Sequence, residues 1–509
     1  MTLNPLLPAA CALMPALLMA AAVPQPRDAA PPSVWQRLRV LTVLALAGTL
    51  ASLAAQLVAP STVSLVPGLA VTTVGAWMAV LVQLLGTVIA FFSARYLEGE
   101  PGQPRYVAAL GGVLAAVQVL LLADHWLVLI AAWAAVGLAL QHLLCFYTDR
   151  PFALLAAHKK RVADRLADVL LIAAAVLAWN DLGTGSLSAL SQALQSGAAS
   201  VALQASAVCL ALAVVLRTAL LPVHGWLIQV MEAPTPVSAL LHAGVINLGG
   251  FVLIKFAPLL EAAPLARGLL VGAGLLTAIL AGMVMLTRIS IKVRLAWSTV
   301  AQMGFMVMEC GLGLYTLALL HLIGHSLYKA HAFLSASGVV EDTRLRLMRG
   351  HVTPSPASMV AAPLLSAAVI AGVIAAAATV LPVPAWPWWW SAVLAFAWAP
   401  LLWLPMNRPA EAPGALAGLL TGAAMVAGLV LAALIGHELP FGVTDAPQAT
   451  AGLVALAGMA LLYLALVRMQ GGAPGLAAWR RWSYAGFYVD EFVTRAALRL
   501  WPARWTAAH

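Results

Sequence analysis

Three side chains able to exchange protons recur one helical turn apart within a single apolar stretch. His321, His325 and Lys329 occupy positions i, i+4 and i+8. If the stretch is helical, they share one face and form a line about 12 Å long. A neutral His both accepts and donates a proton, and a Lys withdrawn from water releases its proton more readily. The spacing favours a proton relay; the alternative is that the three side chains only hydrogen-bond neighbouring helices.

Asp168, Arg217 and His242 also lie within apolar stretches. An ionisable group costs at least about 2.5–3.5 kcal/mol near the centre of a bilayer, so each is a candidate functional residue. Two of them have simpler alternatives. Asp168 follows Arg165 by three positions, which fits a local ion pair, and Arg217 fits a charge that reaches to the membrane interface. Glu309 lies near the end of an apolar stretch, where we expect it at the interface.

The segment between Arg217 and His242 carries three residues that interrupt helices: Pro222, Pro234 and Pro236. Proline removes a helix hydrogen bond and clashes with the preceding turn. Interrupted helices are tolerated in membranes where their free backbone groups line a cavity or an ion site. We therefore predict a broken helix here, with Glu232 beside the break as a candidate gate.

The elements that position these residues are predicted to be membrane-spanning helices. Of 509 residues, 63% are hydrophobic and 9% are charged, and the mean hydropathy is +0.96. Soluble domains carry roughly a quarter charged residues. A chain with so few charges cannot cover a water-facing surface, so we predict an all-α polytopic membrane protein.

Stretches of about 20 apolar residues predict about 15 transmembrane helices, within a range of about 13–16. They fall at 3–24, 39–59, 69–93, 105–124, 125–147, 162–179, 201–224, 235–260, 265–287, 293–312, 314–339, 355–381, 387–405, 412–436 and 449–468. We group them as amino-terminal helices (1–104), a first repeat (105–260), a second repeat (265–405) and carboxyl-terminal helices (412–468). The remaining segment, 469–509, is amphipathic and too charged to cross. It is expected to lie on the inner surface or to dock on a partner.

The distribution of charge predicts the orientation of the chain. Basic residues cluster in alternate loops, for example at 150–161 and 288–294, whereas the segments 180–200 and 437–448 contain no Lys or Arg. Positive loops stay on the inner side of a membrane. The pattern predicts an amino terminus outside and a carboxyl terminus inside.

Several other functions are disfavoured by composition. The net charge of +9 comes from these short loops and not from a basic stripe interleaved with exposed aromatic residues, so nucleic-acid binding is not expected. The four cysteines, Cys11, Cys145, Cys209 and Cys310, are scattered through apolar stretches without metal-ligand spacing. We therefore expect no metal site and no cofactor in this chain, and no catalytic residue.

Several motifs resemble those of the antiporter-like, proton-conducting subunits of respiratory complex I and Mrp antiporters, over residues 70–345. They are Leu221–Trp226, Pro234–Ala243, Ile291-Lys292, Ala296–Thr299, Gln302–Gly304 and His321–Ala330. The resemblance implies two inverted five-helix repeats, each with a broken helix. It also places Arg217, His242, His321, His325 and Lys329 on a proton path, with Asp168 as a family carboxylate and Lys292 as a further path residue.

The chain departs from that family's pattern in its charged residues. The family has a Glu in the fifth helix where this chain has Ala134, and its usual partner Lys is replaced by Arg217. Arg keeps its proton in proteins. Residues 355–381 contain no Lys, and the family's long lateral helix is missing. A relay based on switching Glu–Lys pairs is therefore incomplete here.

A smaller branch fits better. The segments Met308–Gly313, His325–Ser335, Gly486–Arg495 and Leu500–Pro502 resemble DabB, the membrane subunits of Dab-type inorganic carbon transporters. The resemblance implies a bacterial inner-membrane subunit whose ion flow energises CO2 uptake. It also implies a large peripheral partner, DabA, on the cytoplasmic side that holds a zinc site. The alternatives are a proton-pumping subunit of a complex I or hydrogenase-type assembly, a cation/proton antiporter, and a non-conducting membrane anchor.

Overall fold

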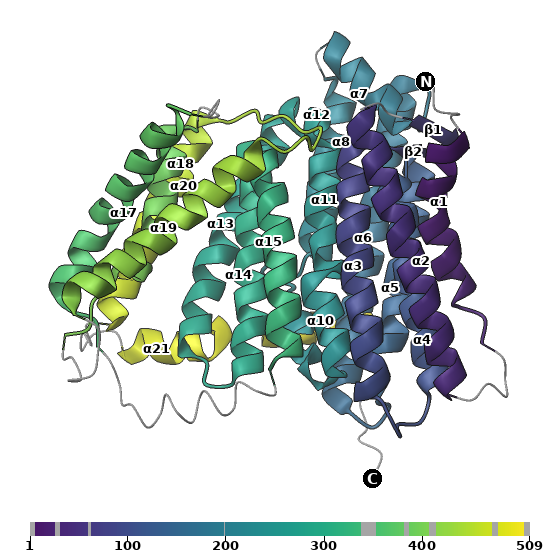
Figure 1. Cartoon of the computed structure of the whole chain (residues 1–509), viewed down its shortest axis with the longest axis horizontal. Coiled ribbons are helices and arrows are strands. Elements are labelled where there is room, and N and C mark those ends of the chain that lie inside the picture. Colours follow the sequence, from purple (N-terminus) through teal and green to yellow (C-terminus); the bar gives the residue numbers. More distant parts are fainter. Residues whose placement is uncertain are drawn as a thin grey trace.

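The structure is a computed structural model that describes residues 6–25, 31–59, 63–197, 199–336, 353–380, 386–406, 414–470 and 477–502. Apart from a short hairpin, β1 (Val63–Val66) and β2 (Leu69–Val71), its regular elements are helices. Long apolar stretches form helices because a backbone in lipid must satisfy its own hydrogen bonds. Figure 1 shows the amino-terminal helices on one side, α13–α15 in the middle and α17–α20 on the other side.

The amino-terminal and central helices that surround the candidate residues have the following bounds. They are α1 (Leu6–Ala21), α2 (Pro31–Val58), α3 (Thr73–Tyr96), α4 (Gln103–Leu122), α5 (Trp126–Leu144), α6 (Pro151–Leu182), α7 (Leu187–Ser196), α8 (Val201–Arg217), α13 (Pro264–Thr287), α14 (Ile291–Leu312) and α15 (Tyr315–Leu334). The peripheral helices are α17 (Pro356–Ala377), α18 (Trp388–Trp398) with the 3-10 helix η3 (Ala399–Leu402), α19 (Ala415–His437) and α20 (Ala449–Gln470).

Every predicted span overlaps a helix, and nine of the described helical segments are long and apolar enough to cross a membrane. In α17 and α19, only 22% of the most apolar window is buried within the protein, and side chains such as Val360 and Leu364 are more than 70% exposed. Such apolar surfaces require lipid around them. The chain is therefore an all-α, multi-pass membrane protein, as predicted, while the count of about fifteen spans stays a prediction.

The chain between Arg217 and Lys255 is interrupted repeatedly. Helix α8 ends at Arg217, and a non-helical stretch with a cis peptide bond before Pro222 follows. The chain then forms α9 (Gly225–Gln229), the 3-10 helix η1 (Val230–Glu232), α10 (Thr235–Ala243), η2 (Val245–Asn247), α11 (Leu248–Lys255) and α12 (Ala257–Glu261). Within Thr235–Lys255, 89% of the most apolar window is buried, so the interrupted segment lies at the core of the helical bundle.

The turn between α14 and α15 fixes the helix that carries His321, His325 and Lys329. Gly313 has φ +78°, a conformation that favours glycine, and a Cβ there would meet the backbone of Ala446. The loop around Ala446 also caps α15, because the Asp445 carboxylate accepts a hydrogen bond from the backbone N–H of Thr316 at 2.7 Å. The α19–α20 loop therefore sets the position of α15.

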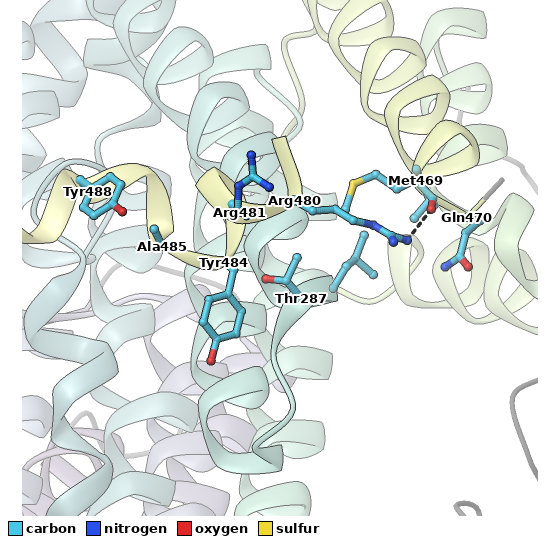
Figure 2. A pocket seen from close by; sticks show the side chains of 10 residues that line it. Thr287, Met469, Gln470, Arg480, Arg481, Tyr484, Ala485 and Tyr488 are labelled. Carbon is cyan, nitrogen blue, oxygen red and sulfur yellow. Dashed lines mark hydrogen bonds between the residues drawn. The ribbon is translucent and has the colours of Figure 1, made fainter. Parts of the chain in front are cut away.

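The described part of the tail comprises α21 (Ala477–Tyr484), the 3-10 helix η5 (Gly486–Tyr488) and α22 (Val489–Leu500). Helix α21 runs along the base of the bundle in Figure 1. We call this end of the bundle the tail face. Figure 2 shows a pocket between α21 and the ends of α13 and α20, where Arg480 donates a hydrogen bond to the carbonyl of Met469 at 2.7 Å. The tail thus docks on its own chain.

Candidate functional site

His321 opens the row of exchangeable side chains on α15 and has a carboxylate partner. Its Nδ1 lies 2.8 Å from Oε2 of Glu309, which comes from α14 and is 3% exposed. Glu309 is therefore buried within the protein and paired, while its expected depth near the membrane interface stays a prediction. The tight turn at Gly313 returns the chain antiparallel, so Glu309 near the end of α14 faces the second turn of α15. In the sequence, the feature that could predict this pairing is a Glu within an apolar stretch next to a glycine turn.

The middle of the row is formed by side chains without hydrogen-bond partners. The rings of His321 and His325 lie 6.2 Å apart between centroids. His242, on α10, stacks on Phe333 at 4.5 Å and is fully buried. Both ring nitrogens of His242 and of His325 lack a hydrogen-bond partner among the described residues. Each unsatisfied buried group costs about 1–3 kcal/mol, so the packing keeps polar groups where stability alone would favour apolar ones.

Lys329 ends the row. It is 1% exposed, and its Nζ donates a hydrogen bond to the backbone carbonyl of Leu295 at 3.0 Å. None of the ion pairs found among the described residues includes Lys329. The structure therefore brings His321, His325, Lys329 and His242 together around α15, with Glu309 at one end.

Asp168 and Arg217 form a second charged centre between α6 and α8. The Arg217 guanidinium pairs with the Asp168 carboxylate, donates to the carbonyl of Trp133 at 2.9 Å, and lies 4.7 Å from the centroid of the Trp133 ring. Arg165 also pairs with Asp168, at 2.9 Å, from a side chain that is 45% exposed. The local pair expected from the sequence is thus present, but Asp168 also compensates the buried charge of Arg217.

A third ion pair lies next to this centre and was not anticipated. Lys160 pairs with Asp164 one turn along α6. Both line the same pocket as Asp168, Arg217 and Ala134. The spacing of Lys160, Asp164 and Asp168 at i, i+4 and i+8 is the sequence pattern that could predict this pair. The pattern is easily overlooked, because the basic residues at 150–161 also indicate membrane orientation. The carboxylates near Arg217 therefore come from α6, whereas α5 contributes Ala134.

The remaining predicted residues lie in the interrupted segment or contact it. Lys292 donates to the Thr235 hydroxyl at 3.2 Å, so it ties α14 to the start of α10. Pro234 immediately precedes α10 and Pro236 lies in its first turn. Glu232 is partly exposed, and its backbone carbonyl accepts a hydrogen bond from Arg150 at 2.7 Å. These residues shape the interruption, and no contact found for the described residues joins Glu232 to the α15 row.

The row on α15 consists of side chains that can exchange protons. Within the described residues, no group of three or more His, Cys, Asp or Glu side chains is placed to hold a metal ion. The row on α15 instead offers a carboxylate, neutral imidazoles and an amine in succession, each of which accepts and releases a proton. The α6–α8 centre holds the permanent positive charge of Arg217 paired with the Asp168 carboxylate, and Asp164 lines the same pocket.

Comparison with known proteins gives a consistent assignment. Residues 123–393 match the family model for the NADH:quinone oxidoreductase/Mrp antiporter transmembrane region, and residues 58–107 match that for the amino terminus of complex I chain 5. The chain is 39% identical over 429 residues to a probable inorganic carbon transporter subunit DabB of Hydrogenovibrio crunogenus, covering 83% of this chain and 82% of that protein.

A second relative matches over a shorter length, and a solved structure superposes on nearly the whole chain. A probable subunit DabB2 of Halothiobacillus neapolitanus is 46% identical over 52% of this chain and 49% of its own length. The solved structure of the Mrp complex from a Dietzia species superposes with a TM-score of 0.61 at 24% identity, over 96% of this chain and 60% of that chain, which supports the shared fold. Together with the family models, the extended match to DabB shows that this chain belongs to the DabB family of inorganic carbon transporter subunits, within the NADH:quinone oxidoreductase/Mrp antiporter superfamily.

Proposed function

We propose that this chain is the ion-translocating, energy-coupling subunit of an inorganic carbon uptake complex, and that the ion is the proton. The observation that carries the proposal is the row of Glu309, His321, His325 and Lys329, joined by His242, inside the helical bundle. The two unpaired histidines are the strongest part of this evidence. Their free ring nitrogens are the places where a proton carried by water would be received and passed on.

The α6–α8 centre has a different role in this proposal. Arg217 stays protonated and remains paired with Asp168, so it does not carry the proton. Its charge instead sets the electrostatic potential felt by the neighbouring groups. Ala134 removes the fifth-helix carboxylate of the wider family, and the carboxylates on α6 take the place beside Arg217.

The uptake reaction itself is assigned to a partner. We propose that a large peripheral DabA-type subunit with a zinc site hydrates CO2 on the cytoplasmic side, and that this chain needs no cofactor. The chain would lie in a bacterial inner membrane with its amino terminus in the periplasm and its carboxyl terminus in the cytoplasm. The alternation of basic loops with loops that contain no Lys or Arg supports that orientation. The tail face would then be the cytoplasmic face.

The test is a pair of substitutions on α15. Lys329→Met removes the exchangeable amine at nearly constant length, and His331→Ala removes an exposed histidine from the same helix as the matched control. With assembly of the complex verified, we expect carbon uptake to fall at least about tenfold for Lys329→Met, by analogy with other proton-transferring groups, and to stay normal for His331→Ala. Normal uptake by an assembled Lys329→Met complex would refute the relay.

A second candidate function is a redox-driven proton-pump subunit. The chain is also 32% identical to NADH-quinone oxidoreductase subunit L of Mycobacterium tuberculosis, over 54% of this chain and 43% of that protein. Purification of the native complex distinguishes the two functions. A co-purifying zinc protein supports carbon uptake, whereas flavin and iron–sulfur subunits support the pump. If the partner remains bound and carbon uptake by the complex is insensitive to an uncoupler, the chain is instead a membrane anchor.

A further inference from the structure

The tail helix α22 makes a specific contact with the tail-face end of α6. The Asp490 carboxylate pairs with Nζ of Lys159 at 2.6 Å, and Lys159 also donates to the Thr494 hydroxyl at 3.0 Å. The other oxygen of Asp490 accepts a hydrogen bond from the Gln229 side chain at 3.1 Å. Asp490 therefore links α6 to the end of α9, within the interrupted segment.

The interrupted segment is shaped to admit this carboxylate. Gly225 begins α9, and a Cβ at this position would overlap the Asp490 carboxylate and lie 2.7 Å from Nζ of Lys159. His224, immediately before it, is fully buried, and its Nε2 lacks a partner among the described residues. His224 also interacts electrostatically with Asp490 and Lys159. The tail thus reaches a polar, closely fitted position and does not merely cover an apolar surface.

The tail carboxylate is more exposed to water than the cation with which it pairs. The Asp490 side chain is 25% exposed, whereas that of Lys159 is 3% exposed. Next along α6, Lys160 and Asp164 are 8% and 14% exposed, and they line one pocket with Asp168 and Arg217. Of the four charged side chains in these two pairs, Asp490 is therefore the most exposed to surrounding water.

We propose that Asp490 is a further residue of the ion path and that the chain completes the tail-face end of that path with its own tail. This inference rests on the proposed function. A proton passes from the Lys159 ammonium to the Asp490 carboxylate, leaving a neutral amine and a carboxylic acid. The acid then releases the proton to water, and the neutral amine takes up the next proton that arrives along the path. The same steps run in reverse for uptake.

The primary test compares two neighbouring acidic residues in the assembled complex. Asp490→Asn removes the inward carboxylate, whereas Glu491→Gln removes an exposed one from the same helix. Proton flux and carbon uptake are measured, and hydrogen–deuterium exchange over 477–502 reports whether the tail stays docked. We expect flux to fall at least about tenfold for Asp490→Asn with the tail docked, and less than twofold for Glu491→Gln. Normal flux for Asp490→Asn overturns the inference.

A second variant separates proton transfer from docking. Other contacts hold the tail, including His158 with the Trp501 carbonyl at 2.9 Å and Arg288 over the Tyr484 ring at 5.1 Å. If Asp490→Asn still releases the tail, the double variant Lys159→Gln/Asp490→Asn provides a neutral hydrogen-bonding pair that restores docking. Continued loss of flux in the docked double variant supports a path residue, and recovered flux overturns it. Lys329→Met, measured in parallel, tests the proposed function separately.

Discussion

Asp168 offers an internal comparison, because one carboxylate pairs with a buried arginine and with an exposed one. Arg217 is 4% exposed at its side chain and Arg165 is 45% exposed. Removing one partner of a buried pair leaves an uncompensated charge and costs about 3–5 kcal/mol, whereas an exposed pair on one helix contributes about 0.3–0.5 kcal/mol. Because Asp168 itself is 12% exposed, we take the lower end of the buried range. Asp168→Asn should therefore destabilise the protein by about 3 kcal/mol, and Arg165→Gln by no more than about 0.5 kcal/mol.

Double-mutant cycles measure the two pairings separately. Unfolding free energies in mixed micelles are compared for Asp168→Asn, Arg217→Met, Arg165→Gln and the two double variants. We expect a coupling energy of about 2 kcal/mol for Asp168 with Arg217, and below about 0.5 kcal/mol for Asp168 with Arg165. Equal coupling energies for the two arginines would show that burial does not govern this centre, and would remove the argument that Arg217 is a fixed, compensated charge.

Two further residues give independent predictions. Glu309→Gln should lower carbon uptake roughly tenfold without loss of assembly, because His321 loses its ionisable partner; unchanged uptake would exclude Glu309 from the row. Asp445→Ala should destabilise the protein by about 1 kcal/mol, because Thr316 N–H loses its acceptor at the start of α15. We expect a lower melting temperature, with carbon uptake kept at temperatures where the protein stays folded. Loss of uptake at unchanged stability would contradict a purely capping role for Asp445.

The sequence was sufficient for features that depend on local geometry. The length of the apolar stretches predicted the helices, because in lipid the backbone can form hydrogen bonds only with itself. The i, i+4, i+8 spacing placed His321, His325 and Lys329 along one helix, because the helical period fixes that relation within a single element. The prolines around Pro222 marked the interruption for the same reason. In each case the cause and the consequence lie within one continuous segment of the chain.

Partners from different helices were harder to predict. Glu309 and His321 are 12 residues apart and meet through the turn at Gly313, whereas Asp490 and Lys159 are separated by 331 residues. Nothing in the local pattern distinguishes an Asp that docks inward from a neighbouring Glu that faces outward. Such pairings are set by how helices pack, and a buried charge was the clue that a partner had to exist.

The two centres differ in how their charges are compensated, and this difference indicates that they have different roles in ion translocation. On α6 and α8, each buried cation has a carboxylate: Lys159 with Asp490, Lys160 with Asp164 and Arg217 with Asp168. On α15, His325 and Lys329 have no carboxylate partner among the described residues, although His321 does. A paired charge resists movement, because separating it from its partner in a low-dielectric interior costs several kcal/mol. Unpaired imidazoles and an amine accept and release protons without breaking an ion pair. On the proposed function, α15 therefore carries the proton through the bundle, and the pair of Arg217 with Asp168 sets the potential. At the tail face, a proton can pass within the Lys159–Asp490 pair without separating two charges, so this pair can end the path.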